Sequence, residues 1–290
     1  MRNRWPLLLA LAGCAAAIGS ASWSGARAGP KIDVLSAMAA ADNSQQTDVD
    51  VELVLAVDVS YSMDPDEQAL QRDGYVSALR SREFLDALAH GTHGRIAVTY
   101  VEWAGVSDQK ILIPWRLIDG PSAAAAVADE ISHAPYRRAY RTSISGALAF
   151  AAAQFETSGH RGIRRVIDVS GDGANNQGPP VVIARDQVVA KGITINGLPI
   201  MLKQPAPGSI DIDNLDVYYE DCVIGGPAAF VVPIREPEQF KEATRTKLVL
   251  EVAGLVASNL VPVSAEAPRI SCTIGERLWQ QRWGSGIDFN

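Results

Sequence analysis

The chain has 290 residues, of which 47% are hydrophobic and 20% charged, enough apolar material for one large domain or one domain with appendages. Its 33 acidic and 26 basic residues give a formal net charge of −7. An acidic chain repels nucleic acid and anionic lipid surfaces, so neither is expected as a partner.

The first 28 residues have the layout of a secretory signal peptide. A basic start precedes an apolar stretch, and small residues lead to Ala26-Arg27-Ala28. The apolar stretch is interrupted at Gly13 and Gly19 and is shorter than the roughly 20 apolar residues that a membrane span needs. Cleavage after Ala28 would remove three arginines and leave 262 residues with a net charge of −10 and no transmembrane segment.

We therefore expect an exported protein, either periplasmic or secreted. A lipoprotein is the alternative, because Leu11-Ala12-Gly13-Cys14 resembles the lipobox in which the cysteine of bacterial lipoproteins receives a lipid anchor. Residues 29–48 are small and polar and are interpreted as a linker. Residues 49–258 are interpreted as the domain, and residues 259–290 as a tail that packs on it.

Two cysteines, Cys222 and Cys272, remain after the predicted cleavage. In an oxidising compartment they can form a disulfide, and two unpaired buried thiols are the alternative.

Six apolar runs have the length and composition of β-strands, and segments of helical length lie between them. The strand-like runs are residues 52–58, 95–101, 110–115, 165–169, 194–200 and 230–234. The helix-like runs are residues 66–80 with a continuation at 82–90, then 122–132, 143–155, 179–191 and 236–257.

Near-continuous Val, Ile and Leu in these strands indicate burial on both faces, which is typical of a parallel sheet flanked by helices. The runs 95–101 and 110–115 have only a short connection, so the second is expected to be an antiparallel edge strand. The predicted fold class is α/β and Rossmann-like. It has a doubly wound, mostly parallel six-stranded sheet with one antiparallel edge strand and helices on both faces.

An oxygen-rich cluster ends the first predicted strand. Residues 52–64 read ELVLAVDVSYSMD, so Asp58, Ser60 and Ser62 stand at alternate positions after a buried run. In open α/β sheets ligands bind beyond the carboxyl ends of the strands, and three oxygens that converge there suit a hard divalent cation. The alternative is an ordinary helix start, since Asp64 and Pro65 are typical of a helix N-terminus.

Two further stretches extend the pattern. RTSISGAL, residues 141–148, places Thr142 at a helix start, and RVIDVSGDG, residues 165–173, runs from a strand into Asp172. This set of residues, in this order and spacing, resembles the metal-ion-dependent adhesion site (MIDAS) of von Willebrand factor type A domains. The likeness covers residues 50–257. The surrounding text, including VIDVSGDGANNQGP, is similar to a family of exported proteobacterial von Willebrand A-like proteins with no assigned function.

The resemblance implies how the metal would be held. Ser60, Ser62 and Thr142 would contact a divalent cation through their hydroxyls, and Asp58 and Asp172 would hold it largely through water. Mg²⁺ is the expected ion, with Mn²⁺ and Ca²⁺ as alternatives. Neutral hydroxyls offset less of the cation's charge than carboxylates do, so the ion keeps its affinity for an acidic side chain of a partner protein.

Five residues are candidates for the rim that a partner would contact. Glu102 and Trp103 end the strand predicted to lie beside the first, Asn175 and Asn176 follow Asp172, and Tyr61 lies between the two serines. Each also has a structural interpretation. Glu102 would be an ordinary surface acid, Trp103 and Tyr61 packing residues, and the asparagines turn formers.

Three other functions compete with a non-catalytic, metal-dependent protein-binding module. In a subtilisin-like protease, His90 would serve as base for Ser143 with Asp58 as its orienter, but only 53 positions separate His90 from Ser143. In a phosphatase, Asp58 would be the nucleophile, but Ser60 occupies the usual place of a second acid and no lysine lies near the motifs in the sequence. The third is a structural periplasmic domain whose metal site is unused.

Overall fold

A computed structural model of the chain describes residues 46–203, 210–254 and 267–283. The predicted signal peptide, the lipobox at Cys14 and most of the predicted linker lie outside them, so export and lipidation stay predictions. Among the helices within these ranges, none has the length and apolar character needed to cross a membrane.

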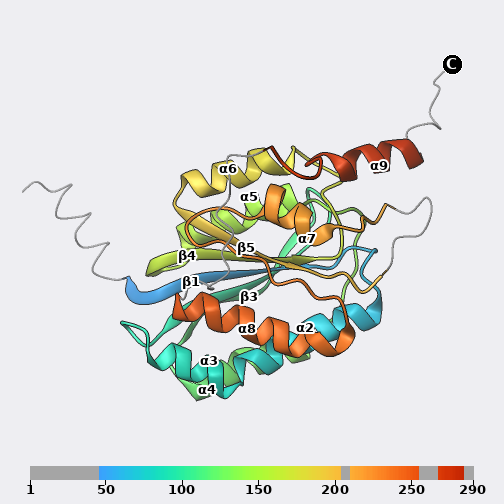
Figure 1. The fold of residues 1–290 in the computed structure, drawn as a ribbon. Helices are drawn as coiled ribbons and strands as arrows, with labels where there is room; N and C mark the ends of the chain where they lie inside the picture. Colours follow the sequence, from blue (N-terminus) through green and yellow to red (C-terminus); the bar gives the residue numbers. More distant parts are fainter. Residues whose placement is uncertain (1–45, 204–209, 255–266, 284–290) are drawn as a thin grey trace, which may run out of the picture. The chain divides into compact units, whose positions relative to one another are not determined.

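Five strands form one sheet in the order β3-β2-β1-β4-β5 (Figure 1). They are β1 (Thr47–Asp58), β2 (Ile96–Trp103), β3 (Gln109–Ile118), β4 (His160–Gly171) and β5 (Ile193–Pro199). β1 pairs in parallel with β2 and β4, β4 pairs in parallel with β5, and β3 is antiparallel to β2. The predicted mostly parallel sheet with an antiparallel edge strand is confirmed, with β1 at its centre.

The predicted sixth strand, residues 230–234, is wrong. Only isolated bridges join Val231 and Ile234 to β5, although the Ile234 amide donates to the Pro199 carbonyl at 2.9 Å. Pro233 has no amide hydrogen to donate, so this segment runs beside β5 without forming a continuous ladder. At the other end of the domain, β1 begins at Thr47, inside the predicted linker.

Helices cover both faces of the sheet (Figure 1). One layer contains α2 (Pro65–Leu79), α3 (Arg82–Ala89), α4 (Pro121–His133) and α8 (Phe240–Ala253), which follows the 3-10 turn η3 (Pro237–Gln239). The other contains α5 (Ile144–Gln154) with the 3-10 turn η1 (Phe155–Thr157), α6 (Val181–Ala190), α7 (Leu215–Tyr218) and the π-helical turn η2 (Tyr219–Val223). The last described helix is α9 (Ile274–Trp283).

β1 shows why the strands read as unbroken apolar runs. Val51, Leu53 and Leu55 pack into the core on the α2 and α8 side, while Val54 and Ala56 pack into the core on the α5 and α6 side. A strand alternates its side chains between the two faces, so a central strand that is covered on both faces needs apolar residues pointing both ways. This burial carries the end of β1, and with it the candidate site, into the interior.

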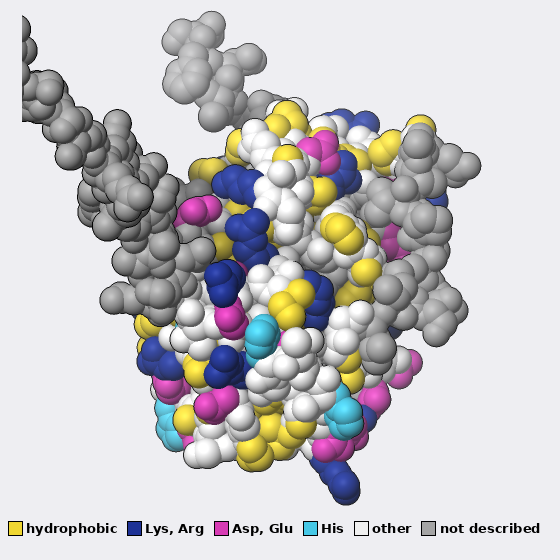
Figure 2. Space-filling model, turned by 90° about the vertical axis from the view of Figure 1, so that its left-hand side faces the viewer, with side chains coloured by type: hydrophobic (Ala, Val, Ile, Leu, Met, Phe, Trp, Pro, Cys, Tyr) yellow, Lys and Arg dark blue, Asp and Glu magenta, His cyan; other side chains and the backbone are white. Residues whose placement is uncertain are grey.

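The end of the sheet opposite the candidate metal residues exposes charged side chains of both signs. Figure 2 views the end at which the parallel strands begin, and there Lys, Arg, Asp, Glu and His side chains are interspersed. Arg161 and Asp48 form an ion pair of 2.7 Å at this end. The candidate metal residues lie at the other end, where the parallel strands finish.

A buried charge cluster joins α8 to the sheet. The Lys247 Nζ atom lies 2.5 Å from a carboxylate oxygen of Asp168 in β4 and 2.5 Å from one of Glu251. Asn196 donates to Glu251 at 3.0 Å, and the Tyr75 hydroxyl to Asp168 at 3.3 Å. Burial, with the charge of Asp168, raises the pKa of Glu251 to about 7, since two carboxylates share one ammonium.

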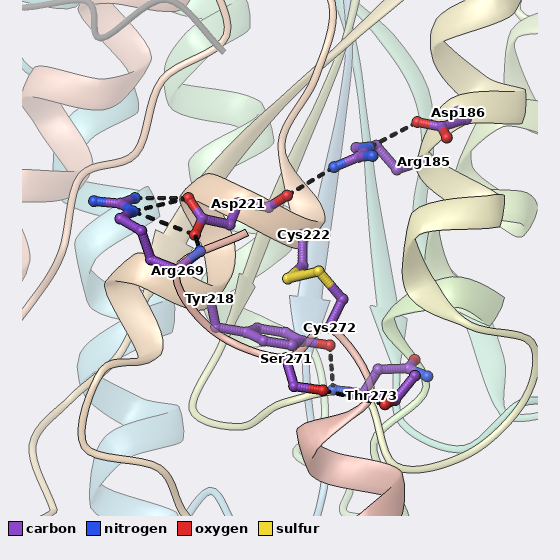
Figure 3. Close-up of a disulfide and its surroundings, with 10 residues drawn as sticks. Arg185, Asp186, Tyr218, Asp221, Cys222, Arg269, Ser271, Cys272 and Thr273 are labelled. Carbon is purple, nitrogen blue, oxygen red and sulfur yellow. Dashed lines mark hydrogen bonds and ion pairs between the residues drawn. A yellow bond between two sulfur atoms is a disulfide. The ribbon is translucent and has the colours of Figure 1, made fainter. Parts of the chain in front are cut away.

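The two cysteines form a disulfide, which decides between the alternatives that the sequence leaves open. The bond joins Cys222 in η2 to Cys272, two residues before α9 (Figure 3). Beside it, Arg269 contacts Asp221 at 2.7 Å and Glu220 at 2.6 Å. The segment that leads into α9 is thus attached to η2 by a covalent bond and by charge pairs.

Glu251→Gln should change how stability depends on pH. The folded state holds a proton on Glu251 that the unfolded chain, with a pKa near 4.5, has released, so the wild type loses stability as the pH rises through about 7. Gln does not titrate and keeps hydrogen-bonding capacity toward Lys247 and Asn196. The free energy of unfolding in urea should be measured for both proteins at pH 5 and at pH 8. The difference between them, variant minus wild type, should be larger at pH 8 by up to about 3 kcal/mol. Exposed Glu238→Gln is the control. If the free energy of unfolding depends on pH in the same way for wild type and Glu251→Gln, Glu251 does not hold the proton.

Replacing both Cys222 and Cys272 with Ala should destabilise the domain. The bond closes a loop with a sequence separation of 50 residues, which restricts the unfolded chain. The chain-entropy model gives about 4 kcal/mol for a loop of this length, and measured losses are often smaller, so we expect a decrease of about 2–4 kcal/mol in urea unfolding. The free energy of unfolding of the wild-type protein in reductant should equal that of the double variant. An unchanged unfolding midpoint in both would show that the bond contributes nothing to stability.

Candidate metal centre

Parallel strand ends bring the two candidate aspartates to one edge of the sheet. Asp58 is the last residue of β1, and Asp172 directly follows β4, the parallel neighbour of β1. Both carboxylates are removed from water, with Asp58 0% exposed and the Asp172 side chain 6% exposed.

A chain of short hydrogen bonds connects four of the five candidate metal residues. The Ser60 amide donates to the Asp58 carboxylate at 2.7 Å. The hydroxyls of Ser60 and Ser62 share a hydrogen bond of 2.7 Å, and the Ser62 hydroxyl donates to Asp172 at 2.6 Å. The loop that carries the serines is short because α2 begins at Pro65. There Asp64 caps the helix by accepting from the Glu67 amide at 2.9 Å.

The fifth residue, Thr142, is held by backbone contacts. It directly precedes Ser143, whose hydroxyl caps α5. The Thr142 amide donates to the Asn176 side chain at 3.0 Å, and the Asn176 amide donates back to the Thr142 carbonyl at 2.8 Å. Thr142 and Ser62 line the same small cavity beside Gly173. All five residues therefore lie together, although they come from three distant parts of the sequence.

The two carboxylates are close enough to affect one another. Burial, followed by the charge of Asp172, raises the pKa of Asp58 well above its ordinary value. Burial also raises the pKa of Asp172 to about 6, against the Ser62 hydrogen bond and the Lys203 charge, which lower it. This is a region of concentrated negative charge that a cation would stabilise.

The residues present fit a hard divalent cation. Oxygen is the only kind of donor atom in the set, and among the described residues the buried Oδ2 atom of Asp58 has no hydrogen-bond partner. Within the described ranges, no three His, Cys, Asp or Glu side chains are grouped to hold a metal, so the hydroxyls of Ser60, Ser62 and Thr142 must provide part of any coordination here.

Lys203 lies beside the site, which corrects the expectation that no lysine is near the motifs. Its Nζ atom is 3.5 Å from Asp172 and 3.8 Å from Asp64, and it also contacts Glu67 and the Ser62 carbonyl. The residue follows β5, the parallel neighbour of β4, so its place in the topology could have revealed it.

Glu102 and Trp103 are not rim residues, because both side chains are buried, at 1% and 0% exposed. Glu102 pairs with Arg72 at 3.3 Å and with Arg137 at 2.8 Å, which together cover it. Burial raises the pKa of Glu102, against the stabilising effect of Arg137 and Arg72. Trp103 packs in the core with Ile144 of α5.

Asn175 and Asn176 are also buried and act as supports rather than as exposed contacts. Asn176 holds Thr142. Asn175 accepts from the Ser145 amide at 3.0 Å and donates to Glu276 of α9 at 2.8 Å. Tyr61 is the one predicted rim residue that is exposed, at 47%.

The alternative protease triad is not assembled. Gly91, next to His90, packs against Asp50 near the start of β1, whereas Asp58 lies eight residues further along the strand, about 26 Å at 3.3 Å per residue. The Ser143 hydroxyl donates to the Gln177 carbonyl at 2.9 Å instead of contacting a histidine.

Sequence reasoning did not find the arginines and the C-terminal helix that flank the site. Arg138 lies over the Tyr61 ring at 4.8 Å, and Arg141 lies over the Trp279 ring of α9 at 3.5 Å. Arg141 and Trp279 are 138 residues apart, and no local sequence pattern predicts a contact between them. The aromatic and arginine content of both segments is the only signal that the sequence offers.

Solved structures share the fold. Proximal thread matrix protein 1 (PTMP1) of the mussel byssus has a TM-score of 0.53 and 12% identity, over 72% of this chain and 48% of PTMP1. The pilus adhesin SpaC of Lactobacillus rhamnosus GG has a TM-score of 0.50 and 11% identity, over 72% of this chain and 31% of SpaC. A von Willebrand factor type A structure from Catenulispora acidiphila has a TM-score of 0.48 and 17% identity, over 70% of this chain and 42% of that one.

This chain thus spans about half the length of PTMP1 and about a third of SpaC. PTMP1 is also known with a zinc-occupied MIDAS motif, in a structure with a TM-score of 0.49 and 16% identity, over 72% of this chain and 49% of PTMP1. At these identities the likeness shows the fold alone, and PTMP1 and SpaC share the predicted α/β fold.

No curated protein sequence matches the chain significantly. A family model matches residues 48–256, which is more than half of the chain and includes all five candidate metal residues. The chain therefore belongs to the family described as protein of unknown function, DUF1194.

Proposed function

We propose that the protein is an exported, divalent-cation-dependent binding module that captures an acidic side chain of a partner protein and performs no catalysis. The observation that carries this proposal is the hydrogen-bonded chain from Asp58 through Ser60 and Ser62 to Asp172. In the part of the chain that the structure describes, the buried Oδ2 atom of Asp58 has no partner. A cation whose direct contacts are mostly neutral hydroxyls remains attractive to a further anion.

The five candidate residues would have two different roles at the metal. Ser60, Ser62 and Thr142 would offer hydroxyl oxygens, while Asp58 and Asp172 would balance the charge and orient the serines. Mg²⁺ is the proposed ion, with Mn²⁺ and Ca²⁺ as alternatives. When bound, the cation would supply the electrostatic attraction for a carboxylate, and Asn176 would keep Thr142 facing it.

The names of the structurally similar proteins are compatible with this role. SpaC is a pilus adhesin, and PTMP1 is a thread matrix protein with a MIDAS motif. The proposed compartment, periplasmic or extracellular, rests on the signal-like N-terminus, and the disulfide agrees with an oxidising compartment. The lipoprotein alternative rests on Cys14.

A phosphatase gains one supporting feature from Lys203, which could approach a phosphate near Asp58. However, Lys203 is already paired with Glu67, and Ser60 stands where such enzymes place a second acid. Hydrolysis of a generic phosphate ester by the protein would support the phosphatase function. An unused metal site is disfavoured because a cavity of about 550 Å³, lined in part by Ser60, Ser62 and Thr142, gives access to the centre.

Asp58→Ala should abolish metal binding without harming the metal-free fold. The substitution removes a buried carboxylate that Asp172 repels, so the metal-free variant should unfold at the wild-type temperature or above it. Mg²⁺ or Mn²⁺ at 100 times its dissociation constant should stabilise the wild type by about 2.7 kcal/mol and leave the variant unchanged. Isothermal titration and thermal unfolding measure both effects. Exposed Asp73→Ala should behave like wild type, and metal affinity retained in Asp58→Ala would falsify the assignment.

Thr142→Ala should weaken Mn²⁺ binding by at least about tenfold, because it deletes one of three hydroxyl ligands. Thr142→Ser keeps the hydroxyl and should restore most of the affinity. The main-chain bonds with Asn176 survive both changes, so the metal-free unfolding temperature should stay close to that of the wild type. Equal Mn²⁺ affinity in the Ala and Ser variants, measured by isothermal titration, would show that the Thr142 hydroxyl is not a metal ligand.

A further inference from the structure

A groove adjoins the candidate metal centre and has features that metal binding does not use. Its cavity of about 550 Å³ is lined by Ser60, Ser62 and Thr142 on the metal side and extends to Tyr140 and to Trp279 of α9. Lys203 and Asp211, which have opposite charges, lie in the same lining. Any ligand bound at the metal would therefore have the groove beside it.

Exposed aromatic side chains are concentrated around this groove. Tyr61, Tyr140 and Trp283 are 47%, 76% and 56% exposed, although burial of such rings is favourable. The Tyr61 and Tyr140 rings also contact one another, with centroids 4.4 Å apart. Tyr, Trp and Arg are the residue types that dominate the energetics of protein interfaces.

Two guanidinium groups lie over aromatic rings that line the groove. Arg138 covers Tyr61 at 4.8 Å, and Arg141 covers Trp279 at 3.5 Å. In the ranges that the structure describes, neither arginine forms an ion pair with a carboxylate. Arg138 donates one N–H to the Tyr61 carbonyl at 2.7 Å, and its buried Nε atom has no acceptor. A stacked guanidinium keeps its in-plane N–H groups available for bidentate binding of a carboxylate.

The backbone fixes one of these arginines next to the metal centre. Arg141 has a φ of 78°, a left-handed conformation that is uncommon for a residue with a side chain. It directly precedes Thr142, whose position is set by Asn176. Strain of this kind persists where the surrounding structure imposes it and is concentrated at functional sites.

The opposite wall of the groove is fixed by α9. A Cβ atom at Gly275 would lie 2.2 Å from the Asn175 carbonyl oxygen, so the helix packs directly on the loop behind Thr142. Glu276 accepts a hydrogen bond from Asn175, and the Cys222–Cys272 disulfide precedes the helix (Figure 3). Trp279 is thus held in place before any partner arrives, which lowers the entropy lost on binding.

We propose that the groove binds an extended partner segment with two acidic side chains. One is directed to the metal, and the second to the guanidinium of Arg141, which lines the groove, or of Arg138, which contacts the lining residue Tyr61. This inference rests on the proposed metal-dependent function and adds the partner's chemistry to it. Side chains at positions i and i+2 of an extended peptide lie on the same face, so a Glu-x-Glu or Asp-x-Asp sequence can present both carboxylates together. The aromatic rings would pack against the apolar parts of the segment.

Two synthetic peptides test the proposal on the Mg²⁺-saturated protein. The first is acetyl-Gly-Glu-Gly-Glu-Gly-amide, and the second replaces the latter glutamate with glutamine. Isothermal titration should show at least about fivefold tighter binding of the diacidic peptide, since hydrogen bonds between charged groups are roughly twice as strong as neutral ones. Arg141→Gln combined with Arg138→Gln should remove that preference and leave the Mg²⁺ affinity unchanged.

Arg277→Gln is the matched control, because Arg277 is exposed on α9 and does not line the groove. It should keep the wild-type preference. Equal affinity of the wild type for the two peptides, absence of binding of both, or a preference that survives the double substitution would each overturn this inference while leaving the metal site intact. Failure of the wild type to bind Mg²⁺ would instead overturn the proposed function, and this inference with it.

Discussion

The close approach of two buried carboxylates, Asp58 and Asp172, is the constraint around which this end of the domain is built. Adjacent parallel strands finish at the same edge, so β1 and β4 place both acids there without any special loop. Their mutual repulsion and desolvation require compensation. The Ser62 hydroxyl and Lys203 supply part of it, and a divalent cation would supply the rest.

The sequence predicted those site residues whose positions depend on a few neighbouring residues in the chain. Asp58, Ser60 and Ser62 come directly after the apolar run of residues 53–57 in β1, and Thr142 stands directly before a helix cap. Spacing of this kind is set by the backbone of a few residues, so it can be recognised without knowledge of the rest of the fold. The antiparallel edge strand was predictable for a similar reason, because a short connection permits no crossover.

The predictions that failed depended on partners distant in the sequence or on a single residue type. Glu102 ends a strand as expected, but Arg72 and Arg137 cover it, and neither is close to it in the sequence. Pro233 interrupts a segment whose composition is otherwise that of a strand. The contacts of α9 with Asn175 and Arg141 cross more than 100 positions, which local patterns cannot encode.

Lys203 has a consequence for ion selectivity. Its ammonium already sits against Asp172, Glu67 and Asp64, so an arriving ion enters a site that holds one positive charge. A sodium or potassium ion that took over the contact with Asp172 would bring no more charge than the ammonium it displaced. A divalent ion would bring twice as much, and the lysine could then turn toward Glu67 alone. A tethered cation of this kind would therefore favour a divalent over a monovalent ion at the proposed metal centre.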